Sequence, residues 1–547
     1  MTKRNNDGHK NDNDHGHGGG ASKTSNLIFF GDSLTDNGNL FKLIGEPAAP
    51  WWKGRFSNGP TYAEQLPALL GVVGAASVQN YAFGGARSQN GNPIPIDLDV
   101  QVQSFIASLH DKMAPKGTEA VLYIGNNDYL NFQPSDPTDP VKTGAEVQAF
   151  IGGVIGHIQT AILSLKAHGV EKIVLFTLPH FSITPAGQFL ASSGPAGQQL
   201  VAGADAIIDG NNAALKALVA ADAAAGIDIT IVDANIFADA VGADSHAFGF
   251  KGTNVPIITG DADAPTGITG LYEINEIAFY NDIHPTYAAH GAQAAFADAT
   301  LMADHVQLYA LSGNTYKGSS GVDFIFAVQG NNLFRGGSGN DIIYAGNGNS
   351  TVYGDSGSDL LFAGGGNNKL FGGSGADLLA VNSGTKTSFG GNELDGGSGD
   401  DILIANRSVT NTLRGGSGDD LIIFKEDAGA LFAHQIIDGG SGDNVLRFII
   451  NDHSAAVADA LKFDFQSIVT AFKAAEKTNH AGTFTVGDLD IRNISGLQLQ
   501  VDSVSNNAAT PYLIDHTILQ TAGEAPEVNS AGAALLQQAA LWGLLTA

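Results

Sequence analysis

The chain has 547 residues, which is enough for several domains, and 55 acidic residues against 27 basic ones give it a net charge of −28. This balance excludes nucleic acid as a partner, because phosphate binding needs clustered lysine and arginine, and it favours the binding of cations. The absence of cysteine excludes disulfide bonds and thiolate metal sites.

Residues 1–25 are rich in Asn, Asp, Gly and His and contain no apolar core. This composition is typical of a disordered tail, and it does not match a signal peptide of the general secretory type. Further along the chain, no stretch approaches the roughly 18–20 continuous apolar residues of a membrane span. We therefore expect no transmembrane segment.

Residues 26–312 alternate short apolar runs with longer segments of helical spacing. The sequence predicts strands at 27–30, 78–82, 120–124, 172–177 and 227–232, and helices at 61–70, 97–112, 144–168, 197–225 and 286–305. Strands that alternate with helices indicate a parallel sheet with helices on both faces. We predict one three-layer α/β/α domain here.

Polar residues follow the first predicted strand directly. The apolar run 27–30 stops at Gly31, and Asp32 and Ser33 come next. Open α/β folds bind ligands at the carboxyl ends of their strands, and a serine at such a position can act as a nucleophile if a base lies nearby. A second Gly-Asp-Ser, at 354–356, lies inside a repeat, and we expect Ser356 to be a turn residue.

Three further polar blocks follow in order. Gly84-Gly85 comes after the second strand, and glycine lets backbone N–H groups approach an oxyanion closely. Asn127 comes after the third strand and supplies a neutral amide donor, and His284 lies before a predicted helix. Taken singly, these blocks fit a turn, a helix cap and a surface histidine. Their order across one α/β domain favours a shared site.

The four blocks together resemble the GDSL/SGNH hydrolase family over roughly residues 26–305. The resemblance implies that Ser33 is the nucleophile and His284 the general base of an ester hydrolase that forms an acyl-enzyme. It also implies an oxyanion hole made of the Ser33 backbone N–H, Gly85 and Asn127. The segment 54–66 further resembles the plant-like and bacterial secreted branch, which contains lipases and esterases.

One position departs from the family pattern. The family usually has Asp three residues before the histidine, whereas this chain has Asn281 there and Asp282 one residue later. An amide can hold an imidazole by a hydrogen bond, but it stabilises imidazolium less than a carboxylate does. We expect a Ser–His pair whose ring is oriented by Asp282 or by a backbone carbonyl, and we favour Asp282.

From residue 318 the sequence becomes periodic. Seven consecutive nine-residue units run from GSSGVDFIF to GGSGADLLA, with Gly at the fourth position and a large apolar residue at the eighth, and further copies occur at 396–404, 415–423 and, more weakly, 439–447. A fixed period indicates a solenoid. These units resemble the glycine-rich nonapeptide repeats of RTX proteins, whose parallel β-roll binds calcium, so we expect a β-roll over 313–450.

The sixth position of the seven units alternates between carboxylate and neutral side chains, in the order Asp323, Asn332, Asp341, Ser350, Asp359, Asn368 and Asp377. Each nonapeptide of a β-roll makes half a turn, so alternate units stack on one side. Ca²⁺ prefers several oxygen ligands, carboxylates among them. We predict calcium mainly between the turns of Asp323, Asp341, Asp359 and Asp377, with Asp401 and Asp420 extending the row. The alternative is a roll of asparagine-rich turns without metal.

Residues 451–547 follow the repeats. They show helical spacing at 455–475, strand-like alternation at 484–504 and a short apolar helix candidate at 533–547. We expect a cap on the roll and a C-terminal secretion signal. In RTX proteins an uncleaved C-terminal signal directs type I export, so the resemblance implies a type I secretion apparatus as a partner and a secreted, extracellular, bacterial protein without an N-terminal signal peptide.

The leading hypothesis is a secreted, calcium-dependent serine hydrolase of carboxylic esters, acting on an ester or lipid substrate. Two alternatives use the same machinery, a phospholipase and a polysaccharide O-acetylesterase. A third belongs to another class, a non-catalytic calcium-dependent surface or matrix protein that uses a hydrolase fold for binding. In each case Ca²⁺ binding would be coupled to folding of the acidic roll.

Overall fold

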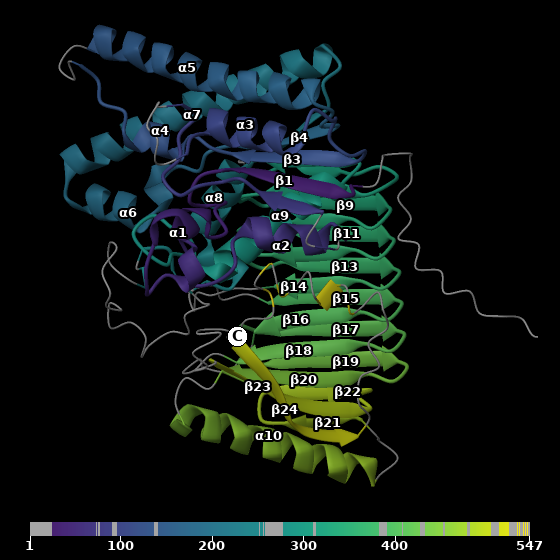
Figure 1. Ribbon diagram of the computed structural model, residues 1–547. Coiled ribbons are helices and arrows are strands. Elements are labelled where there is room, and N and C mark those ends of the chain that lie inside the picture. Colours follow the sequence, from purple (N-terminus) through teal and green to yellow (C-terminus); the bar gives the residue numbers. More distant parts are fainter. Residues whose placement is uncertain are drawn as a thin grey trace, which may run out of the picture.

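The computed structural model describes residues 24–544 except 73, 75–76, 90–95, 136–139, 251, 255, 258–276, 310–312, 382–390, 407–408, 427–432, 452–454, 478–481, 505–513, 524–532, 534, 537–539, 541 and 543. The expected tail at 1–25 therefore lies almost wholly outside the described residues, as does the boundary expected at 312. Figure 1 shows a helix-rich part stacked on one end of a long column of strands.

A five-stranded parallel sheet in the order β2-β1-β3-β4-β5 forms the centre of the helix-rich part. Its strands are β1 (Asn26–Gly31), β2 (Val78–Asn80), β3 (Thr118–Tyr123), β4 (Lys172–Phe176) and β5 (Ile229–Val232). The four residues 27–30 of β1 are all buried. Consecutive burial is expected where both faces of a parallel sheet are covered.

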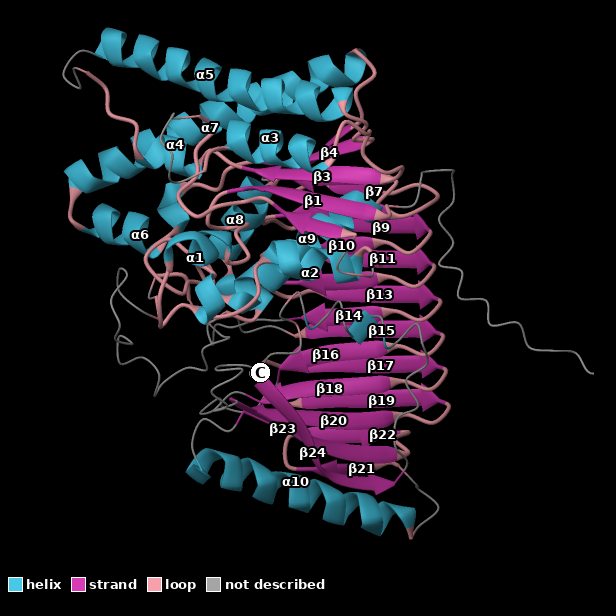
Figure 2. Ribbon diagram, in the orientation of Figure 1, coloured by secondary structure: helices cyan, strands magenta, loops and turns pink. Residues whose placement is uncertain are grey.

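Helices cover both faces of this sheet (Figure 2). One face packs against α3 (Leu98–Ser108), α5 (Pro140–Ala167) and α7 (Pro195–Ala224), and the other against α2 (Tyr62–Leu69), α8 (Ala234–Ala243) and α9 (Tyr287–Met302). The shorter helices are α1 (Asn39–Ile44), α4 (Asn126–Leu130), α6 (Pro185–Ser192), η1 (Trp52–Gly54), η2 (Phe181–Ile183) and η3 (Ser245–Phe248). The predicted three-layer α/β/α class is confirmed.

One helix of the outer layer is long and apolar. Among the described residues, the segment Lys142–Ala167 of α5 would be able to cross a membrane by length and composition alone. Its residues Val154, Ile158 and Ile162 are buried in the core cluster that includes the sheet. A core helix of a globular domain meets the same criterion, so this is weak evidence, and the expected lack of a membrane span stays a prediction.

The column of strands is a β-roll, as predicted from the repeats. One sheet contains β6 (His305–Tyr309), β8 (Asp323–Ala327), β10 (Ile342–Tyr344), β12 (Leu360–Ala363), β14 (Leu378–Val381), β16 (Ile402–Asn406), β18 (Leu421–Glu426), β20 (Val445–Asn451), β23 (Gly496–Val504) and β24 (Ile514–Gly523). The other contains β7 (Thr315–Lys317), β9 (Leu333–Ser338), β11 (Thr351–Ser356), β13 (Lys369–Ser374), β15 (Asn392–Ser398), β17 (Asn411–Ser417), β19 (Gln435–Ser441), β21 (Phe484–Val486) and β22 (Leu489–Arg492). Successive repeats enter the two sheets alternately.

The register of the roll follows from the repeat. Ile343 of β10 pairs with Ile325 on one side and Leu361 on the other, in parallel. These eighth-position side chains point between the two sheets and form a separate core cluster with those of the facing sheet. Helix α10 (Ala455–Glu476) lies across the far end of the roll (Figure 1), and Phe465 and Phe472 close that core.

Helix α9 joins the two parts of the molecule. Every residue from His290 to Thr300 is buried, which is expected of a helix enclosed on all sides. The Phe296 ring contacts Phe237 of α8 at 5.3 Å between centroids, and it contacts Phe324 and Phe326 of β8 at 5.3 and 5.1 Å. The helix-rich part and the first turns of the roll therefore share one hydrophobic core.

The C-terminal segment adds an aromatic residue to the same junction. Trp542 is 1% exposed, and its ring lies against Phe237, Phe248 and Phe296 of the helical part and against Phe362 of the roll. Leu535 and Leu544 are buried in the same cluster. The segment expected to carry an export signal thus contributes core side chains.

We predict that Trp542→Ala destabilises the folded protein. Truncation of a buried Trp typically costs about 3–5 kcal/mol, because transfer energy is lost and a cavity is left. The midpoint of thermal unfolding by calorimetry should fall by several degrees. Phe189→Ala is the matched control, since Phe189 is 80% exposed, and its midpoint should stay near the wild-type value. An unchanged midpoint for Trp542→Ala would contradict the packing.

Candidate functional site

Ser33 and His284 meet although 251 positions separate them in the sequence. Ser33 lies in the turn that follows β1, and His284 lies in the loop before α9. The distance from Ser33 Oγ to His284 Nε2 is 2.9 Å, which is that of a hydrogen bond. Both residues are less than a tenth exposed. The structure thus places a hydroxyl and a possible base in direct contact.

Asn281 fixes the tautomer of the imidazole. Its Oδ1 accepts hydrogen bonds from the backbone N–H groups of Ile283 (3.0 Å) and His284 (2.7 Å), and it lies 3.0 Å from His284 Nδ1. Only the oxygen of the amide can accept from these N–H groups, so Nδ1 must donate to it. This leaves Nε2 without a proton and ready to accept one from Ser33 Oγ.

This geometry corrects the expectation for the orienting side chain, which favoured Asp282. The loop turns back on itself because Asn281 Oδ1 bonds to the backbone N–H groups two and three residues later. The residue three positions before the histidine therefore reaches Nδ1, as the family pattern places it. In this chain that residue is an amide, so the side chain that bonds to Nδ1 is neutral.

Two aromatic rings enclose the histidine. The Phe56 ring stacks on His284 at 5.1 Å with an interplanar angle of 27°, and Trp51 packs edge-on at 5.5 Å and 87°. Burial lowers the pKa of His284 to about 4, because desolvation disfavours imidazolium. The ring is therefore neutral at pH 7. The sequence did not predict these two ring contacts.

Two buried carboxylates tie the loops of the site together. Asp32 accepts hydrogen bonds from Leu34 N (3.1 Å) and from Asn126 Nδ2 (3.1 Å), and Asp36 Oδ2 accepts one from Gly84 N (2.8 Å). These bonds link the loops that follow β1, β2 and β3. Burial raises the pKa of Asp32 to about 7.

The two residues expected to donate to an oxyanion lie in adjoining turns. Asn127 Nδ2 donates to Ala86 O at 3.0 Å, and an amide nitrogen carries a second N–H. Gly85 has φ +77°, a conformation that favours glycine, and it is exposed. At Gly84 a Cβ atom would lie 2.2 Å from the Phe56 ring, so the first glycine makes room for the ring that covers His284. The role of Gly85 and Asn127 stays a prediction.

A second candidate site follows one side of the roll. Each aspartate of the sixth-position row after the first accepts a hydrogen bond through Oδ1 from the backbone N–H of the aspartate one turn before it, at 2.8–2.9 Å. The row consists of Asp323, Asp341, Asp359, Asp377, Asp401 and Asp420. The second oxygen, Oδ2, of the last five is buried without a hydrogen-bond partner among the described residues.

Glycines shape the space beside these oxygens. A Cβ atom built on Gly336 would lie 2.1 Å from Asp341 Oδ2 and 2.8 Å from the carbonyl oxygen of Gly354. The same arrangement recurs at Gly354, Gly372, Gly396 and Gly415. Each cradle thus brings a carboxylate oxygen and a backbone carbonyl oxygen together, which are the ligands that Ca²⁺ prefers. The residues present fit calcium.

Electrostatics support a cation in this row. Burial is the largest cause that raises the pKa of each carboxyl in the row, and neighbouring carboxylates raise most of these pKa values further. The pKa is raised to about 7 for Asp341, about 8 for Asp359, about 7 for Asp377, about 9 for Asp401 and about 7 for Asp420. In the described part of the chain, no three His, Cys, Asp or Glu side chains converge on one point. Backbone carbonyls would therefore have to complete each site.

On the opposite side of the roll, the polar groups at the corresponding positions form hydrogen bonds with one another. Ser350 N donates to Asn368 Oδ1 at 3.0 Å, Asn368 N donates to Asn392 Oδ1 at 2.9 Å, and Asn411 Nδ2 donates to Gln435 Oε1 at 2.8 Å. Neutral side chains here bond to one another. The two sides differ in the way that the alternation of carboxylate and neutral residues predicts, while the calcium ligands themselves stay a prediction.

Comparison with known families fits this architecture, an α/β/α hydrolase-type domain with a Ser–His pair joined to a β-roll. The family model described as "GDSL-like Lipase/Acylhydrolase" matches residues 27–296. The model described as "RTX calcium-binding nonapeptide repeat (4 copies)" matches residues 317–352, 353–385, 387–408 and 410–424. Residues 27–296 therefore match a GDSL-like lipase/acylhydrolase domain, and the repeats that follow match RTX calcium-binding nonapeptides.

Several characterised proteins resemble part of the chain. A phosphatidylcholine-sterol acyltransferase of Aeromonas hydrophila is 29% identical over 175 residues, which is 30% of this chain and 47% of that protein. GDSL esterase/lipase 22 of Arabidopsis thaliana is 30% identical, with 29% and 46% covered, and inactive GDSL esterase/lipase-like protein 23 of the same plant is 29% identical, with 29% and 47% covered. The chain thus spans about half the length of these relatives, one of which is described as inactive.

We predict that Asn281→Asp moves the acidic limb of the pH profile of kcat/KM. His284 is active as a base when neutral, and its pKa is about 4, so wild-type activity should fall only near that pH. A carboxylate on Nδ1 stabilises imidazolium and should raise the limb by at least about one pH unit. Asp282→Asn is the control and should leave the limb in place. If only Asp282→Asn moved the acidic limb of the pH profile, Asp282 and not Asn281 would be the group that orients His284.

We predict opposite pH trends for the stability of the roll with and without calcium. In EDTA no calcium is bound, and the carboxyl groups of the aspartate row have pKa values of about 7–9 in the folded state. These values exceed the pKa of about 3.9 that an aspartate has in the unfolded chain. The folded state then binds more protons, so stability should fall as pH rises from about 5 to 9. With excess Ca²⁺ stability should rise over the same range, because calcium needs ionised carboxylates.

Calorimetry at several pH values measures both trends. Asp401→Asn removes one carboxylate of the row and should weaken both trends. Asp443→Asn changes an exposed aspartate outside the row and should leave both unchanged. A stability in EDTA that rises with pH would rule out the buried row as its source.

Proposed function

We propose that this protein hydrolyses carboxylic esters, with Ser33 as the nucleophile and His284 as the general base. The observation that carries the proposal is the 2.9 Å contact between Ser33 Oγ and His284 Nε2, in a tautomer that makes Nε2 the acceptor. The match of residues 27–296 to the GDSL-like lipases and acylhydrolases supports the reaction class.

The proposed reaction follows the general scheme of serine hydrolases. Ser33 Oγ attacks the ester carbonyl carbon while His284 Nε2 takes the hydroxyl proton. The imidazolium then gives this proton to the departing alkoxide, and the C–O bond to the alcohol breaks, leaving an acyl-enzyme. Water attacks the acyl group with His284 again as base, and the carboxylic acid leaves. The backbone N–H groups of Ser33 and Gly85 and the amide of Asn127 would stabilise the oxyanion.

Calcium would act on this reaction through the fold and not through the chemistry. Bound to the aspartate row, it would supply the positive charge that lets the roll fold with its carboxylates ionised. Phe324 and Phe326 of β8, near the start of the roll, pack on Phe296 of α9. Because His284 lies directly before α9, an ordered roll supports the position of the base.

The place of action is part of the same proposal. RTX repeats suggest export by a type I apparatus into surroundings where calcium is plentiful, and ester or lipid substrates would be met there. The relative named phosphatidylcholine-sterol acyltransferase gives a reason to include phospholipids among the substrates tested. The relatives described as inactive keep a non-catalytic binding protein as the second candidate.

We predict that Ser33→Ala lowers ester turnover by at least about 10³-fold, as loss of a serine nucleophile does in related chemistry. Chromogenic esters of acetate, butyrate and octanoate, a phospholipid and an acetylated polysaccharide form the panel, each measured with Ca²⁺ and with EDTA. Wild-type activity should fall in EDTA and return with Ca²⁺.

Ser356→Ala is the matched control, because Ser356 occupies the second Gly-Asp-Ser. It is the last residue of strand β11 of the roll and not the turn residue that the sequence had led us to expect. The variant should keep wild-type turnover. Turnover that is the same in wild type and Ser33→Ala on every substrate would favour the non-catalytic protein.

A further inference from the structure

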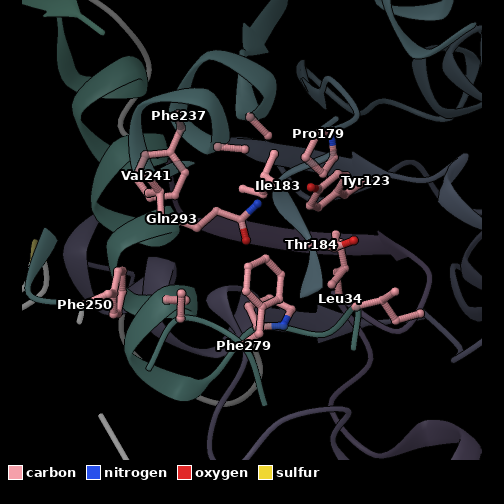
Figure 3. Close-up of a pocket in the computed structure, with 16 residues that line it drawn as sticks. Leu34, Tyr123, Pro179, Ile183, Thr184, Phe237, Val241, Phe250, Phe279 and Gln293 are labelled. Carbon is pink, nitrogen blue, oxygen red and sulfur yellow. The ribbon is translucent and has the colours of Figure 1, made fainter. Parts of the chain in front are cut away.

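An apolar cavity lies beside the Ser–His pair (Figure 3). Its lining includes Leu34, which follows the nucleophile, and Ile283 and Pro285, which flank the histidine on both sides. Its volume is about 90 Å³. The cavity therefore begins at the neighbours of both reacting residues.

The far side of the cavity is apolar. Figure 3 shows Leu34 and Thr184 on one side and Phe237, Val241 and Phe250 on the other. No side chain in the lining carries a charge: the lining contains no Asp, Glu, Lys, Arg or His. A ligand that fills this space must be uncharged and apolar, because a buried unpaired charge or polar group would be disfavoured.

Its polar members are already engaged. The hydroxyl of Tyr123, at the end of β3, is hydrogen-bonded to the side chain of Gln293 of α9, and Thr184 Oγ1 donates to Phe181 O at 2.8 Å. These groups then have little to offer a polar ligand. Hydrocarbon is the ligand chemistry that the lining matches.

The geometry points to this cavity as the pocket for the acyl chain of the ester, an inference that rests on the proposed function. The carbonyl carbon bonded to Ser33 Oγ carries two substituents, the acyl chain and, before it leaves, the alcohol. Gly85, on the predicted oxyanion side, is exposed, so that side is open for a departing alcohol. The apolar cavity beside Leu34 is left for the acyl chain.

The size of the cavity sets the length of chain that it accepts. An apolar cavity of roughly 150 Å³ accommodates the six carbons of benzene. By the same measure, about 90 Å³ accommodates about four carbons. The pocket thus favours short acyl chains, and the remainder of a longer chain has to lie outside it.

A second layer of aromatic rings backs the far wall. Phe237 contacts Phe248 at 5.5 Å and Trp542 at 6.4 Å between ring centroids, and Phe248 contacts Tyr344 of the roll at 5.0 Å. Packed rings of this kind do not yield easily to a longer chain. The length limit is therefore supported by the roll and the C-terminal segment, although neither lines the cavity.

The test is kcat/KM of the calcium-loaded, full-length protein on p-nitrophenyl acetate, butyrate, hexanoate, octanoate and palmitate. Each buried methylene adds about fourfold to binding, so kcat/KM should rise by roughly tenfold from acetate to butyrate and stop rising near hexanoate. A flat profile from acetate to octanoate, or a rise that continues to palmitate, would overturn the inference.

Two variants fill the cavity from different helices, Ala238→Phe from α8 and Ala289→Phe from α9. Each should lower the butyrate-to-acetate ratio of kcat/KM by about tenfold. Ala202→Phe, at an exposed position of α7, is the matched control and should leave the ratio unchanged. Unchanged ratios in both folded filling variants would also overturn the inference.

The result separates the two proposals. Ser33-dependent turnover with no effect of the cavity variants rejects the acyl pocket and keeps the esterase. Absence of turnover on every ester rejects the esterase, and the acyl pocket with it. If a filling variant fails to fold, as judged by circular dichroism, the other variant and the wild-type chain-length profile still decide.

Discussion

The burial of α9 on all sides is the constraint on which the rest of the structure depends. One face of the helix packs on the five-stranded sheet and the other on the first turns of the β-roll. A helix with no solvent face is stable only when both partners are present, because a large apolar surface would otherwise meet water. The roll therefore covers the face of α9 that the sheet of the GDSL-like domain leaves uncovered.

This arrangement connects the charge of the roll with the site. The aspartate row places carboxylates one above another in buried positions, so the roll resists folding at neutral pH unless protons or cations neutralise it. Without the roll, Phe296 of α9 loses Phe324 and Phe326. The loop that carries His284 leads directly into α9. Under the proposed function, a cation bound in the roll would in this way affect the position of His284.

The features that the sequence predicted are those that depend on local residue patterns. Apolar runs that stop at Gly31 or Gly125 mark strand ends, and the nine-residue period defines the roll. What the sequence did not predict depends on contacts between distant segments. His180 lies between Asp239 (2.9 Å) and Asp209 (3.0 Å), which raise its pKa to about 9, and no spacing shows this. The contacts of Trp542 and the residues that line the cavity could not be predicted either, because they also come from segments that are distant in the sequence.

The amide at position 281 fits a site that is this strongly desolvated. Trp51 and Phe56 exclude water from His284, and a carboxylate buried beside a neutral imidazole would lack a cationic partner. Asn281 supplies the acceptor that fixes the tautomer without introducing that charge. Under the proposed mechanism, Asn281 would stabilise the imidazolium of His284 less than a carboxylate does, and catalysis would be slower for that reason. In return, the site would contain no buried negative charge beside the neutral ring.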